Sequence, residues 1–225
     1  MIFAPKPAGR IVGALFLSQM LIGIYINFSL LQPLTGEPGF LVAGAASSAK
    51  FGLIALLALA IASFNLIIAA IGYRIFSRHN PLLAILALAF PVVSLALTGV
   101  EYAHVMELVS YSQAYQGASV ADQALLATLR PVVAASRNWA HFMAIGVSGF
   151  SLFLFYLMLL RSSAAPRWLM GFGVLAAALQ VAAVSQAFVG NGVPVLMLLP
   201  LALAQLLLPL YFIVRGIAVR ADLAT

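Results

Sequence analysis

Residues 51–73, FGLIALLALAIASFNLIIAAIGY, decide the fold class of this chain. The stretch carries no charged side chain, and Ser63 and Asn65 are its strongly polar groups. As an α-helix it would be about 35 Å long at 1.5 Å per residue, which is enough to cross the roughly 30 Å hydrocarbon core of a bilayer. It is therefore predicted to be a transmembrane helix.

Five more apolar stretches of similar length follow the same pattern. The first is too long for the apolar region of a cleaved signal, so we expect it to span the membrane. The whole chain is 64% hydrophobic and 7% charged, whereas an ordinary water-soluble domain is about 25% charged. We therefore expect an all-α, polytopic integral membrane protein, a single domain over residues 1–225 that forms a six-helix bundle. The predicted spans cover approximately residues 11–33, 51–73, 82–111, 138–160, 168–189 and 195–214.

The basic residues between these stretches predict the orientation. Eleven Lys and Arg against five Asp and Glu give a net charge of +6, which in a soluble protein would suggest nucleic acid. Here we expect contact with the lipid bilayer and no nucleic acid. Eight basic residues fall on one side of the spans and three on the other, so both termini are predicted to be cytoplasmic, in a bacterial inner membrane. The larger group comprises Lys6, Arg10, Arg74, Arg78, Arg161, Arg167, Arg215 and Arg220, and the smaller group Lys50, Arg130 and Arg137.

The connection between the third and fourth spans, residues 116–136, is too polar to cross lipid. Ser119 followed by Asp122 resembles a helix-capping box with a shorter acid, and the helical run then stops before Pro131. We expect a short amphipathic helix on the outer surface that turns its leucines toward lipid or protein. A plain loop is the alternative.

Packing inside lipid relies on small residues and on polar groups that bond between helices. The residues expected to have this role are Gly146, Gly149, Gly173, Ala177, Asn65 and Gln205. Pro91 is expected to kink the third span, with a partner helix or Ser94 satisfying the carbonyl that the proline leaves free.

Ionisable residues gather on the third and fourth spans and form the candidate site. Glu101, His104 and Glu107 recur every three residues, and Arg137 and His141 lie four residues apart, so each set shares a helix face. Charged groups in a membrane usually point into the bundle or a wet cavity, so a polar pocket in the outer half is predicted. Asn27 and Gln186 fall at the same expected depth and are further pocket candidates.

Three interpretations of this pocket remain open. Glu101 could pair with Arg137 or His141 and only fix the packing. The pocket could bind or pass a small lipophilic or amphipathic molecule. It could also hold haem or a divalent metal ion, with His104, His141 and Glu101 as ligands. The chain has no cysteine, and His79 lies in a loop on the opposite side, which excludes zinc–thiolate and three-histidine sites.

The order and wording of several segments resemble a bacterial family of six-helix membrane proteins known as domain of unknown function 4386. The resemblance covers most of the chain. Its most specific parts are the joint of the fourth and fifth spans and the last span. The matching segments are GRIVGALFLSQMLIGIYINFSLLQPLTG (residues 9–36), RIFSRHN (74–80), RNWAHF (137–142), LLRSSAAPRWLMGFGVLAA (159–177) and LPLALAQLLLPLYFIVRGI (199–217).

The resemblance implies the topology but no activity. Members usually carry Arg and Glu early in the third span and Glu in the sixth, where this chain has Pro91, Ser94 and Gln205. No nucleophile, nucleotide or phosphate-loop motif is present, which argues against an enzyme. We therefore expect a protein that binds or transports a small lipophilic ligand, or an accessory subunit of a homo-oligomer or larger complex. A haem- or metal-dependent redox protein is the alternative.

Overall fold

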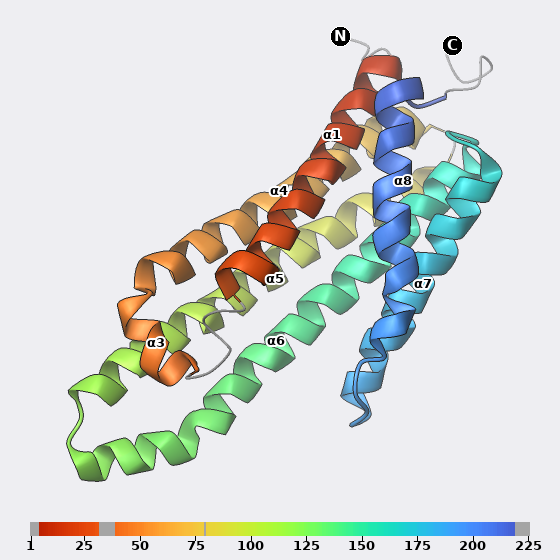
Figure 1. The fold of residues 1–225 in the computed structure, drawn as a ribbon. Coiled ribbons are helices and arrows are strands. Elements are labelled where there is room, and N and C mark those ends of the chain that lie inside the picture. Colours follow the sequence, from red (N-terminus) through yellow and green to blue (C-terminus); the bar gives the residue numbers. More distant parts are fainter. Residues whose placement is uncertain (1–4, 32–38, 79, 219–225) are drawn as a thin grey trace. The chain divides into compact units, whose positions relative to one another are not determined.

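The computed structural model describes residues 5–31, 39–78 and 80–218. Over these residues the chain is helical and contains no β-strand (Figure 1). His79 and Arg220, which were assigned to one side of the predicted spans, lie outside the described residues. In chain order the elements are α1 (Pro5–Ile24), the π-helical η1 (Tyr25–Leu31), α3 (Phe40–Ala46), α4 (Ser48–Phe76), α5 (Pro81–Gly117), α6 (Val120–Arg161), α7 (Arg167–Phe188), the 3-10 helix η2 (Val195–Met197) and α8 (Leu199–Arg215).

Six helical segments in the described part of the chain are long and apolar enough to cross a membrane. This confirms the predicted number of spans. Each segment contains most of its predicted range because hydropathy is a local property of the sequence. The segments are Lys6–Leu31, Ser48–Phe76, Pro81–Gly117, Val120–Arg161, Arg167–Phe188 and Val195–Arg215.

The helix predicted after Ser119 is present, but its predicted end before Pro131 is wrong, and its position on the outer surface stays a prediction. Only Ala118 and Ser119 separate α5 from α6, and α6 continues through Pro131 without a break. The capping prediction is confirmed, because the Ser119 hydroxyl accepts a bond from the Asp122 amide (3.3 Å) and donates to its carboxylate (2.7 Å). Pro131 bends a helix by removing one amide donor but does not have to end it. The amphipathic segment is thus the first part of α6.

The described residues divide into two compact units. Unit 1 comprises the described residues within 1–20, 62–95 and 145–225, and its core consists of large side chains from α1, α4, α6, α7 and α8. Close packing here depends on glycine. A Cβ at Gly13 of α1 would lie 2.6 Å from the carbonyl oxygen of Pro209 in α8. The fully buried large side chains include Val12, Phe76, Tyr156, Met158, Leu159, Met170, Leu208 and Phe212.

Unit 2 comprises residues 21–61 and 96–144 and has a core of its own. The sequence did not predict the short helix α3, which is bound to α5 through its backbone. The buried Ser112 hydroxyl donates to the Leu41 carbonyl (2.9 Å) and accepts from the Ala45 amide (2.8 Å). The Gln116 amide donates to the Val42 carbonyl at 2.9 Å. These three hydrogen bonds hold α3 against α5 in unit 2.

Candidate functional site

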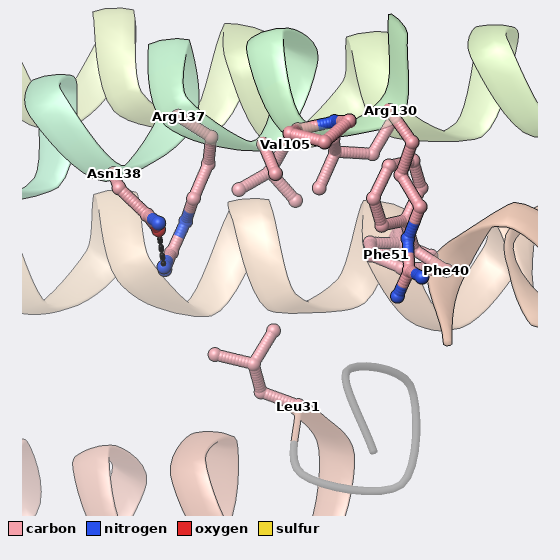
Figure 2. A pocket seen from close by; sticks show the side chains of 10 residues that line it. Leu31, Phe40, Phe51, Val105, Arg130, Arg137 and Asn138 are labelled. Carbon is pink, nitrogen blue, oxygen red and sulfur yellow. Dashed lines mark hydrogen bonds between the residues drawn. The ribbon is translucent and has the colours of Figure 1, made fainter. Parts of the chain in front are cut away.

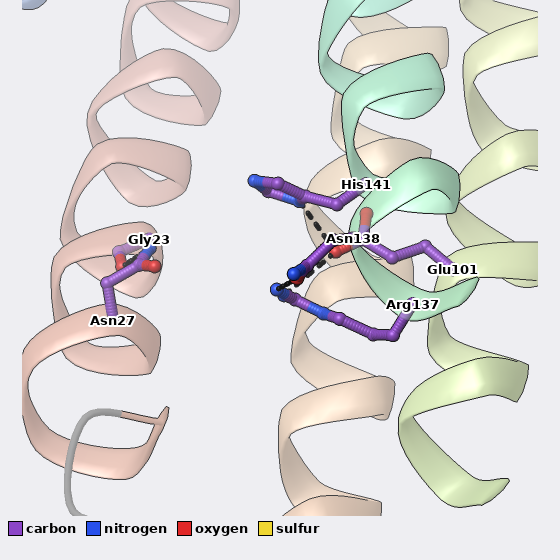
Figure 3. Close-up of polar contacts among 6 residues, drawn as sticks. All are labelled: Gly23, Asn27, Glu101, Arg137, Asn138 and His141. Carbon is purple, nitrogen blue, oxygen red and sulfur yellow. Dashed lines mark hydrogen bonds and ion pairs between the residues drawn. The ribbon is translucent and has the colours of Figure 1, made fainter. Parts of the chain in front are cut away.

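The centre of the candidate site is the carboxylate of Glu101 in α5. Its Oε1 atom accepts one bond from Nδ1 of His141 (2.8 Å) and another from Nη2 of Arg137 (3.3 Å), as Figure 3 shows. The Glu101 side chain is 5% exposed, and those of Arg137 and His141 are 17% and 35% exposed. A carboxylate this buried needs charged or donating partners to offset its lost hydration.

The helical repeat explains why these three residues meet. Arg137 and His141 are four residues apart in α6, so their side chains leave the same face one turn from each other. Glu101 is presented by α5, which precedes α6 in the chain. The sequence analysis predicted that Glu101 would pair with either partner, and the structure shows both bonds.

His104 does not join this cluster. Its Nδ1 atom lies 2.7 Å from Oε2 of Glu107, one turn further along α5, and this carboxylate is 61% exposed. Each step of three residues turns the helix face by about 60°, so Glu107 faces well away from Glu101. The two histidines of unit 2 therefore bind different carboxylates.

Asn27 and Gln186 form hydrogen bonds with other partners. The exposed Asn27 amide donates to the carbonyl of Gly23 in its own helix at 2.8 Å, and Figure 3 shows it away from Glu101. Gln186 belongs to unit 1, near the end of α7, where its side chain accepts a bond from Asn191 at 2.9 Å. Neither residue contributes to the geometry around Glu101 in unit 2.

A cavity of about 360 Å³ opens beside the cluster within unit 2. Its volume falls in the range typical of sites for small molecules, and apolar side chains form most of its wall. Figure 2 shows Arg137 and Asn138 near one end and Arg130 with Phe40 near the other. The lining residues are Leu31, Phe40, Phe51, Val105, Leu108, Arg130, Pro131, Ala134, Arg137 and Asn138.

Arg137 links the cluster to the cavity, because it lines the wall while its guanidinium bonds Glu101. Arg130 is different. Its guanidinium carbon lies 5.8 Å from the centre of the Phe40 ring, a distance at which cations interact with aromatic faces. Arg130 was expected only as a topology signal, not as a residue that lines a cavity. The signal was present, since Arg130 and Arg137 are seven residues apart and share a helix face.

The predicted metal site is not assembled. Among residues 5–31, 39–78 and 80–218, no group of three or more His, Cys, Asp or Glu side chains lies close enough to hold a metal ion. The proposed ligand set of His104, His141 and Glu101 is therefore divided, with His104 on Glu107. The haem hypothesis, which needs only the two histidines, stays a prediction.

Most of the small residues named for packing lie where α6 meets α7 in unit 1. A Cβ at Gly149 would lie 3.1 Å from the Gln180 amide nitrogen, and one at Gly173 would lie 2.5 Å from the Tyr156 ring. At Gly146 the nearest atom, in Val184, would be 3.7 Å away. The structure adds a bond from Gln180 to the Ile145 carbonyl at 3.2 Å. Ala177 is fully buried.

The sequence analysis missed the small residues Gly9 and Gly13 of α1, although their spacing of four is the usual packing signal. Gly9 lies against the backbone of Gly216 and Ile217, just beyond α8. Asn65, in contrast, lines a small cavity of unit 1 with Ala87, Pro91 and Ser151. The predicted interhelical roles of Asn65 and Gln205 stay predictions.

The model of the family described as "Domain of unknown function (DUF4386)" matches residues 11–216. The chain belongs to the DUF4386 family. The match includes all six apolar segments except a few residues at the start of the first, so this DUF4386 protein is a multi-pass membrane protein. No curated protein and no solved structure matches it.

Two positions at which the resemblance implies charges in other DUF4386 proteins are uncharged and lie in unit 1 of this chain. Ser94 is buried, with 6% exposed, and Pro91 lines the small cavity beside Asn65. The charged cluster of this DUF4386 protein, Glu101 with Arg137 and His141, lies further along α5 and belongs to unit 2.

Proposed function

We propose that this DUF4386 protein binds or transports a small amphipathic ligand in the cavity of unit 2. The observation that carries the proposal is the combination in one cavity of an apolar wall and a guanidinium group held by a buried carboxylate. Small-molecule sites are usually concave and mainly apolar, with a few fixed polar groups that orient the ligand. Here Glu101 is a positioning residue, because it holds Arg137 at the wall.

The surrounding helices support a ligand that enters from a membrane. The cavity is lined by residues of η1, α3, α4, α5 and α6, all within unit 2. An amphipathic molecule partitions into lipid and reaches such a site without crossing water. A role as an accessory subunit in a homo-oligomer or larger complex is compatible with the same ligand site.

The binding experiment uses the purified full chain in phosphatidylcholine nanodiscs and radiolabelled decanol as a neutral amphipathic probe. We expect saturable binding above that of empty nanodiscs. Ala134→Phe places an aromatic ring at the cavity wall and should remove saturable binding. Ala127→Phe, which adds the same ring at an exposed position of α6 outside the lining, should leave binding unchanged. Equal binding by both variants would show that the cavity is not the site.

The proposed topology places a single transmembrane domain in the bacterial inner membrane with both termini in the cytoplasm. It rests on the eight-to-three distribution of basic residues. Because the chain has no cysteine, single cysteines report accessibility without a background. Ser77→Cys should react with an impermeant maleimide only after cells are opened, and Val120→Cys in intact spheroplasts. Reaction of both from the same side would contradict this topology.

A further inference from the structure

We infer that the cavity of unit 2 selects amphiphiles with an anionic head, and that Arg130 is the residue that binds this head. The inference rests on the proposed function, because it assigns a ligand class to the same cavity. Arg130 and Arg137 differ in their ion pairing. Both line the cavity, but among the ion pairs of the described residues only Arg137 is bound to a carboxylate.

The acidic side chains described in unit 2 are all engaged elsewhere. Glu101 accepts bonds from Arg137 and His141, and Glu107 pairs with His104. The Asp122 carboxylate accepts the Ser119 hydroxyl at 2.7 Å. None of the ion pairs among the described residues includes Arg130, whose guanidinium rests against the Phe40 ring instead.

Among the residues that the structure describes, this arrangement leaves an excess of positive charge at one end of the cavity. The charge of Arg137 is balanced by Glu101, whereas that of Arg130 is not balanced by a described carboxylate. Arg130 is exposed, so water screens part of its charge, and the Phe40 ring limits this screening on one side of the guanidinium. A carboxylate or phosphate head matches the planar donors of a guanidinium, which can bind two acceptor oxygens at once.

The cavity volume indicates how much of a ligand the cavity can surround. About 360 Å³ corresponds to roughly a dozen non-hydrogen atoms, if each occupies about the 30 Å³ of a liquid water molecule. Val105, Leu108 and Phe51 provide apolar wall for a chain. Decanoate, with one carboxylate and a ten-carbon chain, has this size and is the probe we choose.

The test compares decanoate with decanol and decyltrimethylammonium, using the full chain in phosphatidylcholine nanodiscs. We expect decanoate to bind about ten- to a hundredfold more tightly than decanol, the range typical of a hydrogen bond to a charged group. Decyltrimethylammonium should bind most weakly. Decyl phosphate distinguishes a phosphate head from a carboxylate, and inorganic phosphate alone should fail to compete if the apolar chain is required.

Variants then assign the preference to Arg130. Arg130→Gln should reduce decanoate affinity to that of decanol, and Arg130→Lys should keep part of the preference. The matched control is Arg78→Gln, which removes one positive charge from an exposed position outside the cavity and should change nothing. Thermal unfolding of each variant checks that it folds. If Arg130→Gln does not fold, the affinities of the wild-type chain for decanoate and decanol still test the preference for an anionic head.

The outcomes separate the two proposals. If neither decanol nor decanoate binds saturably, the proposed function fails. If both bind equally well to the wild-type chain, ligand binding stands and the inference about anions is overturned. A preference for decanoate that survives in Arg130→Gln would also overturn the assignment to Arg130.

Discussion

Arg137 bonds Glu101 across two helices at 3.3 Å, and both side chains lie mostly inside unit 2, with 17% and 5% of their surface exposed. Removing one member of a buried ion pair is costly, because it leaves the other charge without a partner. Glu101→Gln should therefore lower the free energy of unfolding by about 3 kcal/mol. Chemical denaturation in detergent would measure the change.

A matched control exists on the same helix. Glu107→Gln changes the same atoms in the exposed pair with His104, where solvent screens the charges, and should change stability little. In the double variant Glu101→Leu with Arg137→Met, much of the lost stability should return, since two apolar groups replace a matched pair. Similar losses in both single variants would show that burial of the Glu101 pair has no special importance.

The attachment of α3 to α5 can be tested at a single oxygen atom. Ser112→Ala removes the hydroxyl that bonds both the Leu41 carbonyl and the Ala45 amide, which should cost about 1–3 kcal/mol. Hydrogen exchange over residues 40–46 should become faster. Ser110→Ala makes the same substitution at an exposed position of α5, and faster exchange in that variant as well would count against the specific bond.

Two nearby glycines of α7 should respond oppositely to alanine. Gly173→Ala places a Cβ 2.5 Å from the Tyr156 ring, so the helices must separate, at a cost of about 1–3 kcal/mol. Gly171→Ala meets no atom within 4 Å and should be neutral or slightly stabilising, because alanine favours the helix. The two melting temperatures measured in the same detergent give the comparison, and equal shifts would contradict the packing in unit 1.

The bond from Gln180 to the Ile145 carbonyl should contribute little by itself. Hydrogen bonds between helices in membranes average about 0.6 kcal/mol, so Gln180→Leu should be only mildly destabilising. Gly149→Ala should cost more than Gln180→Leu, since its Cβ would lie 3.1 Å from the Gln180 amide nitrogen. Combining Gly149→Ala with Gln180→Ala should recover stability. A larger loss from Gln180→Leu alone would mean that the bond is stronger than this average.

The six long helices could be predicted because the length and apolar composition of each stretch indicate a transmembrane helix without information from the rest of the chain. The structure of the region after residue 116 could not be predicted. Its polar composition suggested a surface segment, and Pro131 suggested that the helix would end before this residue. A proline removes one donor and can kink a helix, but α6 continues through Pro131. The helix α3 was missed because seven residues are too few to show a reliable period, and contacts with Ser112 and Gln116 position it.

The candidate site was predictable where spacing alone decides which side chains share a face. Arg137 and His141 met Glu101 as their spacing of four indicated. His104 did not, and it pairs with Glu107 instead, although Glu101 is also three residues away on α5. Which of two carboxylates a histidine binds depends on side-chain torsion angles. The spacing of residues along a helix does not predict these angles. The same holds for Asn27, whose amide turned to the carbonyl of Gly23.

The length of α6, 42 residues, affects how this protein can be imaged by electron microscopy. At 1.5 Å per residue they extend about 60 Å, roughly twice the thickness of the acyl layer, and a tilt of about 20° shortens this by only a few ångströms. We therefore expect part of α6 to lie outside the acyl layer. A nanobody raised against the turn at Ala118 and Ser119 would give this 23.7 kDa chain the added mass and asymmetry that single-particle electron microscopy requires.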